Sequence, residues 1–453
     1  MSYNEHIARP RTATPSVERE IRDFLEEHVK VLAPLLRESH LASWSAATGE
    51  GGAEAEERSA LTRAAVKRLY ANAGNAARVR AWLRSGEVRD PLLHRQLVLL
   101  DHEYTGSLLS EETIEDLIRR SASLEQTFYT FRASLDDERV GNNLLLEVLR
   151  DETDGTRRQR AWEASKQVGR EVAEPLRELV RRRNTAARSL GFDNYYRMEL
   201  ELQELDEERL FGILDELREL SDPAFRELRS GMDATLGERF AIRPDELRPW
   251  HWQDFFGQEA PSVSPVDLDV FFQDADLEET AAVFFRGIGL PVDDVLERSD
   301  LYEREGKDQH AFCIDIDRQG DVRTLCNLRP NEKWMSTLLH ELGHAAYDKF
   351  IPRSLPFLLR SPSHTLSTEA IAMFMGRLTR DPEWLREVVG ADLGETEAED
   401  IRRQLRAGML VSARWILVMA YFERELYRDP DRPDLNRLWW DLVERIQFIR
   451  RPE

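Results

Sequence analysis

The chain has 453 residues, 41% of them hydrophobic and 33% charged, which excludes both a disordered polymer and a protein built of apolar membrane spans. Its 63 basic and 85 acidic side chains give a net charge of −22, which argues against nucleic acid as a partner because phosphate contacts require a basic face. The first thirty residues hold no apolar signal segment, and no stretch approaches about 18 uninterrupted apolar residues, so we expect a cytoplasmic protein without a membrane partner.

Helical periodicity dominates the chain. A first helix is predicted after Thr14-Pro15, because threonine caps helices and proline fits the first turn. The polar segment 49–59 then indicates a loop. Apolar residues at helical spacing predict further helices, in chain order, at 114–135, 158–190, 205–238, 276–288, 331–349, 366–378 and 398–426. We therefore expect an all-α, mainly helical fold without internal repeats.

One segment departs from the helical pattern. Residues 309–328 contain the run HAFCIDIDRQGDVRTLCNL, in which apolar and polar side chains alternate on both sides of Arg318–Asp321. This alternation predicts a β-hairpin. Cys313 and Cys326 are placed symmetrically about that turn, so they are predicted to face each other across the strands, with a reduced pair favoured over a disulfide in a cytosolic protein.

The run LLHELGHAAYD carries the strongest chemical signal. His340 and His344 are one helical turn apart on a helix that Pro330-Asn331 opens, so both imidazoles can share one zinc ion. Glu341 follows the first histidine and can take a proton from an attacking water. The alternative is an ordinary amphipathic helix, since the bare five-residue pattern also arises by chance.

Three features favour the metal site over that alternative. The polar triplet lies on a helix whose other residues are apolar, and buried ionisable groups are unfavourable unless they are paired or metal-bound. Glu369, among apolar neighbours in the first turns of the next predicted helix, is a natural third zinc ligand, so the zinc-site helices span 331–378. The hairpin directly upstream offers a strand edge that could bind an extended peptide by strand addition.

These residues lead to a family resemblance that covers nearly the whole chain. The chain resembles the angiotensin-converting enzyme (peptidyl-dipeptidase A) family of gluzincin zinc metallopeptidases, in its bacterial form. Beyond the zinc region, the resemblance rests on FLEEHVKVLAPLLRESHLASWSAATG (24–49), LVRRRNTAARSLGFDNYY (179–196) and NRLWWDLVERIQFIRRPE (436–453). The oligopeptidases of thimet type share the fold and are the nearest neighbouring family.

The resemblance assigns roles to particular residues. It implies that His340, His344 and Glu369 hold one zinc ion as cofactor and that Glu341 is catalytic. The pair His310-Ala311 matches a strand that binds the substrate backbone, and Gln253 matches a glutamine that binds the substrate carboxylate. Packing is the favoured alternative for Gln253.

The resemblance also implies the architecture and the activity. A single peptidase domain, 1–453, would consist of two intimately packed helical lobes flanking a deep channel. The expected activity is zinc-dependent hydrolysis of short peptides, with dipeptides released from the C-terminus. A thimet-type oligoendopeptidase is a second possibility.

Two departures from the family pattern lead to another alternative. The sequence stops at Glu453, before a family segment that binds the substrate carboxylate and stabilises the reaction intermediate. Met373 stands where the family has an aspartate that orients a zinc histidine. A catalytically impaired, zinc-binding homologue that holds peptides or a partner protein is therefore the alternative function.

Overall fold

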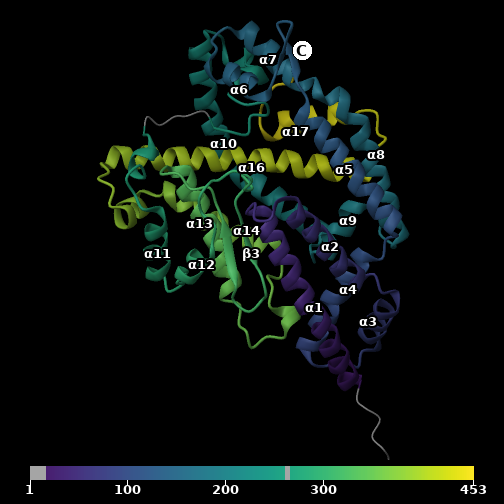
Figure 1. The fold of residues 1–453 in the computed structure, drawn as a ribbon. Helices are drawn as coiled ribbons and strands as arrows, with labels where there is room; N and C mark the ends of the chain where they lie inside the picture. Colours follow the sequence, from purple (N-terminus) through teal and green to yellow (C-terminus); the bar gives the residue numbers. More distant parts are fainter. Residues whose placement is uncertain (1–16, 261–265, 453) are drawn as a thin grey trace, which may run out of the picture. The chain divides into compact units, whose positions relative to one another are not determined.

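The structure is a computed structural model that describes residues 17–260 and 266–452. The chain divides into two compact units, and each unit is built from two separate stretches of sequence. Unit 1 comprises Met1–Leu108 and Asp269–Thr379, and unit 2 comprises Leu109–Leu268 and Arg380–Glu453. Figure 1 shows the helices that make up most of the chain, which confirms the predicted mainly helical fold. The predicted channel between the lobes stays a prediction.

Four helices form the first part of unit 1. Apolar residues recur every three or four positions in them and bury one stripe of each helix. The predicted start at Thr14-Pro15 lies outside the described residues, and the first described helix begins at Val17. The helices are α1 (Val17–Ala47), α2 (Gly52–Tyr70), α3 (Ala73–Ser85) and α4 (Pro91–Ser107), and they share a core that includes Ile21, Leu32, Val79, Leu97 and Tyr104.

The loop predicted at 49–59 is wrong for most of its length, because α2 begins at Gly52. The helix buries only small side chains there, Ala55 and Ser59, so its apolar period is weak in the sequence. A turn remains before it. Gly49 has a φ of +76°, and a Cβ at that position would lie 2.7 Å from the carbonyl oxygen of Gly306. Glycine therefore permits both the turn and the close backbone approach.

The second part of unit 1 holds the predicted hairpin and the two predicted metal-site helices. Figure 1 shows α13, α14 and β3 lying together. The hairpin strands pair antiparallel, and β4 is flanked on its other side by Asp300. The elements are α11 (Leu277–Gly287), α12 (Asp293–Arg298), β3 (Phe312–Asp315), β4 (Val322–Leu325), α13 (Glu332–Lys349) and α14 (Thr365–Gly376).

The hairpin is confirmed, but its predicted register is wrong. Cys313 pairs with Thr324 rather than with Cys326, and both cysteines are free thiols. The turn lies one residue earlier than predicted, because the Asp315 carboxylate accepts the backbone N–H groups of Asp317 and Arg318 and so starts the turn at once. Such side-chain turns at aspartate compete with ladder pairing.

Unit 2 is helical apart from one small hairpin. The strand residues Ala133–Leu135 were predicted to continue a helix. Instead Asp136 and Asp137 adopt positive φ and form a tight turn, which aspartate tolerates. The elements are α5 (Glu111–Thr130), β1 (Ala133–Leu135), β2 (Glu138–Val140), α6 (Asn142–Asp151), α7 (Gly155–Lys166), α8 (Val168–Ser189), α9 (Tyr195–Leu202), α10 (Glu207–Phe240), α16 (Glu395–Arg428) and α17 (Leu435–Ile446).

Short helical turns connect these elements. They are η1 (Pro244–Glu246), η2 (Pro249–His251), η3 (Leu268–Phe271), η4 (Phe357–Leu359), η5 (Arg377–Arg380), α15 (Pro382–Trp384) and the π-turn η6 (Leu385–Val389). The helix predicted at 158–190 is divided at Gln167, between α7 and α8.

Helix α16 is the central element of unit 2. It packs against α10 and α17, and the shared core includes Phe211, Leu417, Val418, Leu442 and Ile446. By length and composition alone, it is the one described helix that could cross a membrane. Its Arg414 is fully buried and pairs with Asp222 of α10 at 2.6 Å, and Leu417 and Val418 are buried in unit 2, whereas Ile416 is exposed. The absence of a membrane partner stays a prediction.

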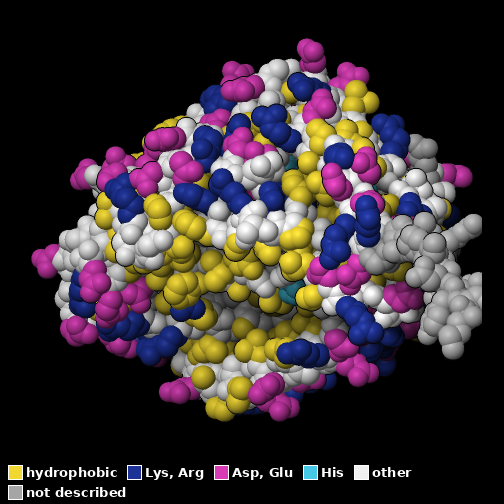
Figure 2. Space-filling model, turned by 90° about the horizontal axis from the view of Figure 1, so that it is seen from below, with side chains coloured by type: hydrophobic (Ala, Val, Ile, Leu, Met, Phe, Trp, Pro, Cys, Tyr) yellow, Lys and Arg dark blue, Asp and Glu magenta, His cyan; other side chains and the backbone are white. Residues whose placement is uncertain are grey.

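Charged side chains of both signs are intermingled over the surface. On the visible face in Figure 2, acidic and basic groups are mixed around a central area that is mainly hydrophobic. Many pairs join successive helical turns, such as Arg182 with Glu178 at 2.8 Å and Arg197 with Glu201 at 2.7 Å. Each such exposed pair stabilises its helix by only about 0.3–0.5 kcal/mol. The arginine charges are thus compensated locally, despite the net charge of −22.

Candidate metal centre

Helix α13 presents the HExxH motif because of its cap and its buried stripe. The Asn331 side chain accepts the backbone N–H of Trp334 at 2.9 Å, which satisfies one of the free donors at the helix start. Met335, Leu338, Leu339 and Leu342 are fully buried and fix the orientation of the helix in unit 1. The predicted polar residues are thereby held along one side of α13.

Helix α14 lies unusually close to α13. A Cβ at Gly343 would lie 2.9 Å from the Cα of Ala372, and a Cβ at Gly376 would lie 3.2 Å from the Cβ of His340. The Ser336 hydroxyl also donates to the carbonyl oxygen of Gly376 at 2.8 Å. The glycine inside HELGH therefore lets the two backbones approach, and this approach brings the next helix to the histidines.

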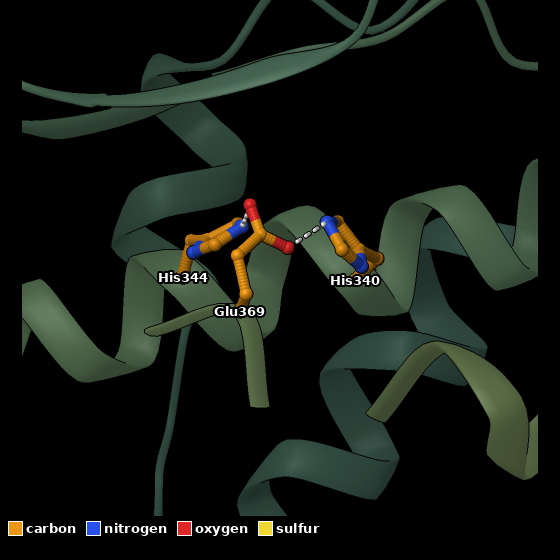
Figure 3. A group of neighbouring side chains, drawn as sticks. All are labelled: His340, His344 and Glu369. Atoms are coloured by element: carbon orange, nitrogen blue, oxygen red, sulfur yellow. Dashed lines mark ion pairs between the residues drawn. The ribbon is translucent and has the colours of Figure 1, made fainter. Parts of the chain in front are cut away.

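The approach places Glu369 opposite both histidines. Figure 3 shows its carboxylate between the two imidazole rings, with one oxygen directed to each. The distances from Nε2 to the nearer oxygen are 3.6 Å for His340 and 3.6 Å for His344. One ligand atom from each of the three residues lies within 4.8 Å of the others. The structure thus brings the three predicted ligands together.

The donor set fits zinc. Zinc prefers four ligands in a tetrahedron, with nitrogen and oxygen at about 2.1 Å, which puts neighbouring ligand atoms about 3.4 Å apart. The two separations of 3.6 Å, each to a different oxygen of Glu369, are close to this value. Burial lowers the pKa of His340 and of His344, which favours the neutral imidazole that binds a metal. Two histidines and one carboxylate leave a fourth position open for water or substrate.

Glu341 is buried beside this group without belonging to it. Its side chain is only 7% exposed. Burial, with a further contribution from the negative charge of Glu369, raises the pKa of Glu341 to about 7. A carboxyl group with a pKa near neutrality can accept a proton and release it again, as general acid–base chemistry requires.

The three ligands and Glu341 line one cleft of about 550 Å³ in unit 1. The hairpin forms part of the wall through Ala311, Phe312 and Cys313. His310 was predicted to lie on the substrate strand beside Ala311, but it is exposed, precedes β3 and does not line the cleft. Its backbone N–H donates to Asp308, which keeps it in a turn. The remaining lining residues are Asp348, Pro362, His364, Thr365 and Thr368.

Two other predicted features lie away from this cleft. Gln253 belongs to unit 2, where it is half-buried after the turn η2, so its proposed contact with substrate stays a prediction. Met373, which replaces the aspartate expected from the family pattern, is 59% exposed.

Asp348 is the lining residue that the sequence reasoning missed. It lies one turn beyond His344 on α13, so the 340, 344, 348 spacing was a usable signal. Burial, with a contribution from the nearby charge of Asp315, raises the pKa of Asp348 to about 7. The cleft therefore carries three acidic groups.

Comparison with known proteins supports the family rather than the individual site. The family described as angiotensin-converting enzyme matches residues 15–248, just over half of the chain. No curated protein matches the chain. The matched range covers helices of both units and ends before α13, so the site residues rest on their motif and geometry. The chain belongs to the angiotensin-converting enzyme family of peptidases.

Proposed function

We propose that this chain is a zinc-dependent peptidase that hydrolyses short peptides and releases dipeptides from their C-termini. The family assignment supports peptide hydrolysis in general. The observation that carries the zinc site is the Glu369 carboxylate, 3.6 Å from a ring nitrogen of each histidine of the HExxH motif. His340, His344 and Glu369 would hold the ion.

The residues of the cleft then have distinct roles. Bound zinc supplies a Lewis acid that polarises the scissile carbonyl and makes water more acidic. Glu341 takes the proton of the attacking water and delivers it to the leaving amine. The wall at Ala311, Phe312 and Cys313 offers backbone groups that can pair with an extended peptide.

Zinc and hydrolysis are to be measured separately. Protein purified without chelators should contain about one zinc ion per chain, and His344→Ala should remove most of it. Glu341→Gln should keep the zinc and lower turnover of a short N-blocked peptide by at least about 1000-fold, because it removes the base but no ligand. Glu297→Gln changes an exposed glutamate outside the cleft and should leave both measurements unaltered.

The products identify the kind of peptidase. Mass spectrometry should find C-terminal dipeptides, and an amidated C-terminus should abolish their release. Cleavage only at internal bonds would favour a thimet-type oligoendopeptidase instead. Zinc bound with no cleavage of any peptide would favour a homologue that binds peptides without hydrolysing them.

A further inference from the structure

Helix α13 carries a further carboxylate on the side that faces the cleft. Asp348 follows His344 by four residues, as His344 follows His340, and all three line the same cleft. Residues four apart lie above one another on a helix. The Asp348 carboxylate is therefore placed next to the reacting centre, on the side of the hairpin residue Cys313.

This carboxylate lacks a partner within the part of the chain that the structure describes. The Oδ1 atom of Asp348 is fully buried and has no hydrogen-bond partner there, and no described cation forms an ion pair with the side chain. Burying a carboxylate oxygen without a partner is unfavourable. Asp348 also lines the cleft, which makes its carboxylate a candidate for contact with a donor of a bound ligand.

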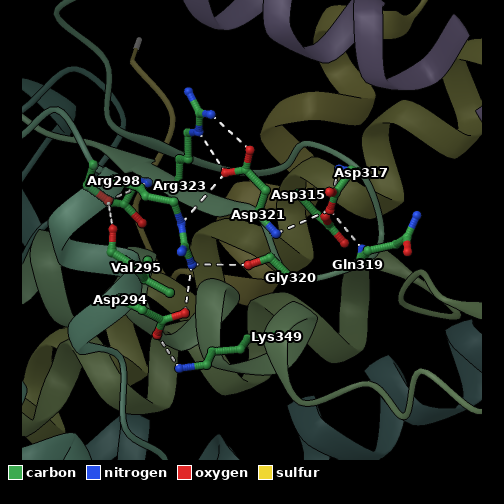
Figure 4. A network of polar contacts seen from close by, with 12 residues as sticks. Asp294, Val295, Arg298, Asp315, Asp317, Gln319, Gly320, Asp321, Arg323 and Lys349 are labelled. Carbon is green, nitrogen blue, oxygen red and sulfur yellow. Dashed lines mark hydrogen bonds and ion pairs between the residues drawn. The ribbon is translucent and has the colours of Figure 1, made fainter. Parts of the chain in front are cut away.

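The neighbouring acids, in contrast, are engaged by the hairpin. Asp315 accepts the backbone N–H of Arg318 at 2.8 Å, and Asp317 accepts those of Gln319 at 2.8 Å and Asp321 at 3.2 Å (Figure 4). These bonds hold the turn of the hairpin. They use the carboxylates of Asp315 and Asp317 within the protein, whereas Asp348 lines the cleft.

The nearby arginine is also engaged elsewhere. The Arg318 guanidinium lies over the ring of Phe357, with 5.4 Å from Cζ to the ring centroid. Its charge acts on Tyr70, Asp315, Glu103 and Asp348 together. Asp348 thus has a cation in its surroundings but no bonded one among the described residues.

Acidic side chains dominate the charge of the cleft. Among the residues that line it, all within the described chain, none is lysine or arginine, whereas Glu341, Glu369 and Asp348 are acidic. A divalent ion at the proposed site would be held by Glu369 and the two histidines. Asp348 lines the same cleft and is not one of those ligands.

We propose that Asp348 is a specificity-determining residue that selects peptides carrying a cationic nitrogen beside the scissile bond. The nitrogen would donate a charge-assisted hydrogen bond to the side of the Asp348 carboxylate that lines the cleft. It could be a lysine or arginine side chain, or the free α-ammonium group of a short peptide. This inference rests on the proposed function, and it names the substrate class of that site.

Binding of matched peptides tests the inference. The zinc-loaded full chain carrying Glu341→Gln would be titrated calorimetrically with N-acetylated peptides that differ only in lysine against norleucine, scanned through the two positions on each side of the bond. At one position lysine should bind about 10- to 100-fold more tightly. Asp348→Asn should bring that ratio close to one, and Asp348→Glu should restore part of it.

Peptides with a free N-terminus and peptides with an acetylated one distinguish the two possible sources of the cationic nitrogen. If the α-ammonium group is the partner, acetylation should weaken binding and the lysine scan should be flat. Glu297→Gln, which removes an exposed acid of the same unit, should leave every ratio unchanged. A lysine-to-norleucine ratio near one at every position, together with no effect of acetylation, would overturn the inference.

Two further readouts separate this inference from other roles. If Asp348→Asn lowers zinc content, or weakens lysine and norleucine peptides equally, then Asp348 merely supports the helix or His344 and the inference is wrong. Hydrolysis by the unmodified chain is followed in parallel. If the chain prefers cationic peptides but hydrolyses none, the proposed function is wrong and the inference stands. If it hydrolyses peptides without preferring cationic ones, the inference is wrong and the proposed function stands.

Discussion

Two buried arginines of unit 2, Arg158 and Arg229, end on oxygen atoms of the protein, whereas in unit 1 the buried Oδ1 of the cleft residue Asp348 meets no described donor. Arg158 is fully buried and donates to the carbonyl oxygens of Trp250, Glu152 and Trp252 at 2.8–2.9 Å. Arg229 is likewise buried and reaches Asp233 and the carbonyl of Gln447. The buried Oδ1 of Asp348 has no such bond.

This difference distinguishes buried charges that stabilise the fold from buried charges that serve a function. A buried charge that is fully bonded holds chain segments in place, because removing it leaves its partners without donors. A buried charge without partners destabilises the fold and persists only where it serves another purpose. We therefore expect substitutions in unit 2 to act on stability, and those at the cleft of unit 1 to act on binding and turnover.

The largest effect on stability is expected at Arg158. Arg158→Met keeps an apolar side chain in place but removes the donors of three carbonyl oxygens, so the free energy of unfolding should fall by about 3–5 kcal/mol. Thermal and urea unfolding would measure this. Arg160→Met, on the same helix, removes an exposed pair with Asp136 and should lower stability by less than about 1 kcal/mol. Equal effects of the two variants would contradict the structural role.

Acid sensitivity offers a finer comparison, because each unit has a buried, neutral histidine among its described residues. Burial lowers the pKa of both His28 in unit 1 and His251 in unit 2 to about 4, from 6.5 when unfolded. Protonation therefore favours the unfolded chain. Each neutral histidine contributes fully to the free energy of unfolding above pH 6.5, and this contribution is lost as the pH falls toward 4. The loss is roughly 3 kcal/mol for each histidine.

The two histidines should respond differently to replacement by phenylalanine. Nε2 of His28 has no described partner, whereas Nδ1 of His251 accepts the backbone N–H of Arg248 at 2.9 Å. Either variant should reduce the loss of stability between pH 6.5 and 4, measured by urea unfolding. At pH 7, His28→Phe should be neutral or stabilising, and His251→Phe should lower stability by about 1 kcal/mol. An unaltered pH dependence in both would disprove the buried, neutral state.

Local signals in the sequence were sufficient for helix α13 and for the ligand set. The apolar stripe, the Asn331 cap and the HExxH spacing all lie within one helix. Glu369 could be predicted as well, because a carboxylate among apolar residues needs a partner. The structure brings it to the histidines. That these residues bind zinc stays a prediction.

The failures have identifiable physical causes. The register of the β3–β4 hairpin depends on the turn that Asp315 starts. The strand pair at 133–140 depends on two aspartates at positive φ. Neither turn alters the hydrophobic pattern of the sequence. Helix α2 buries small side chains, so its period was too weak to read. The spacing of Asp348 after His344 was a usable signal, but the neighbours that give it significance, Asp315 and Cys313, reach it only through tertiary packing.

The smallest predicted effect concerns the glycine that sets the spacing of α13 and α14. Alanine is favoured over glycine by about 0.5–1 kcal/mol inside any helix. Gly231 of α10 in unit 2 has open space around its Cα, so Gly231→Ala should gain this stability. Gly343→Ala should not, because its Cβ would lie 2.9 Å from the Cα of Ala372, and relieving that overlap counteracts the gain.

The consequence of Gly343→Ala should appear at the metal site. Moving α14 away from α13 carries Glu369 away from His340 and His344, whose nitrogens lie 3.6 Å from its oxygens. We expect zinc affinity, measured by competition with a chelator, to fall about tenfold, which corresponds to about 1.4 kcal/mol. Gly231→Ala should leave it unchanged. An unaltered zinc affinity in Gly343→Ala would mean that side-chain flexibility, rather than the close packing of the two helices, determines how Glu369 reaches the histidines.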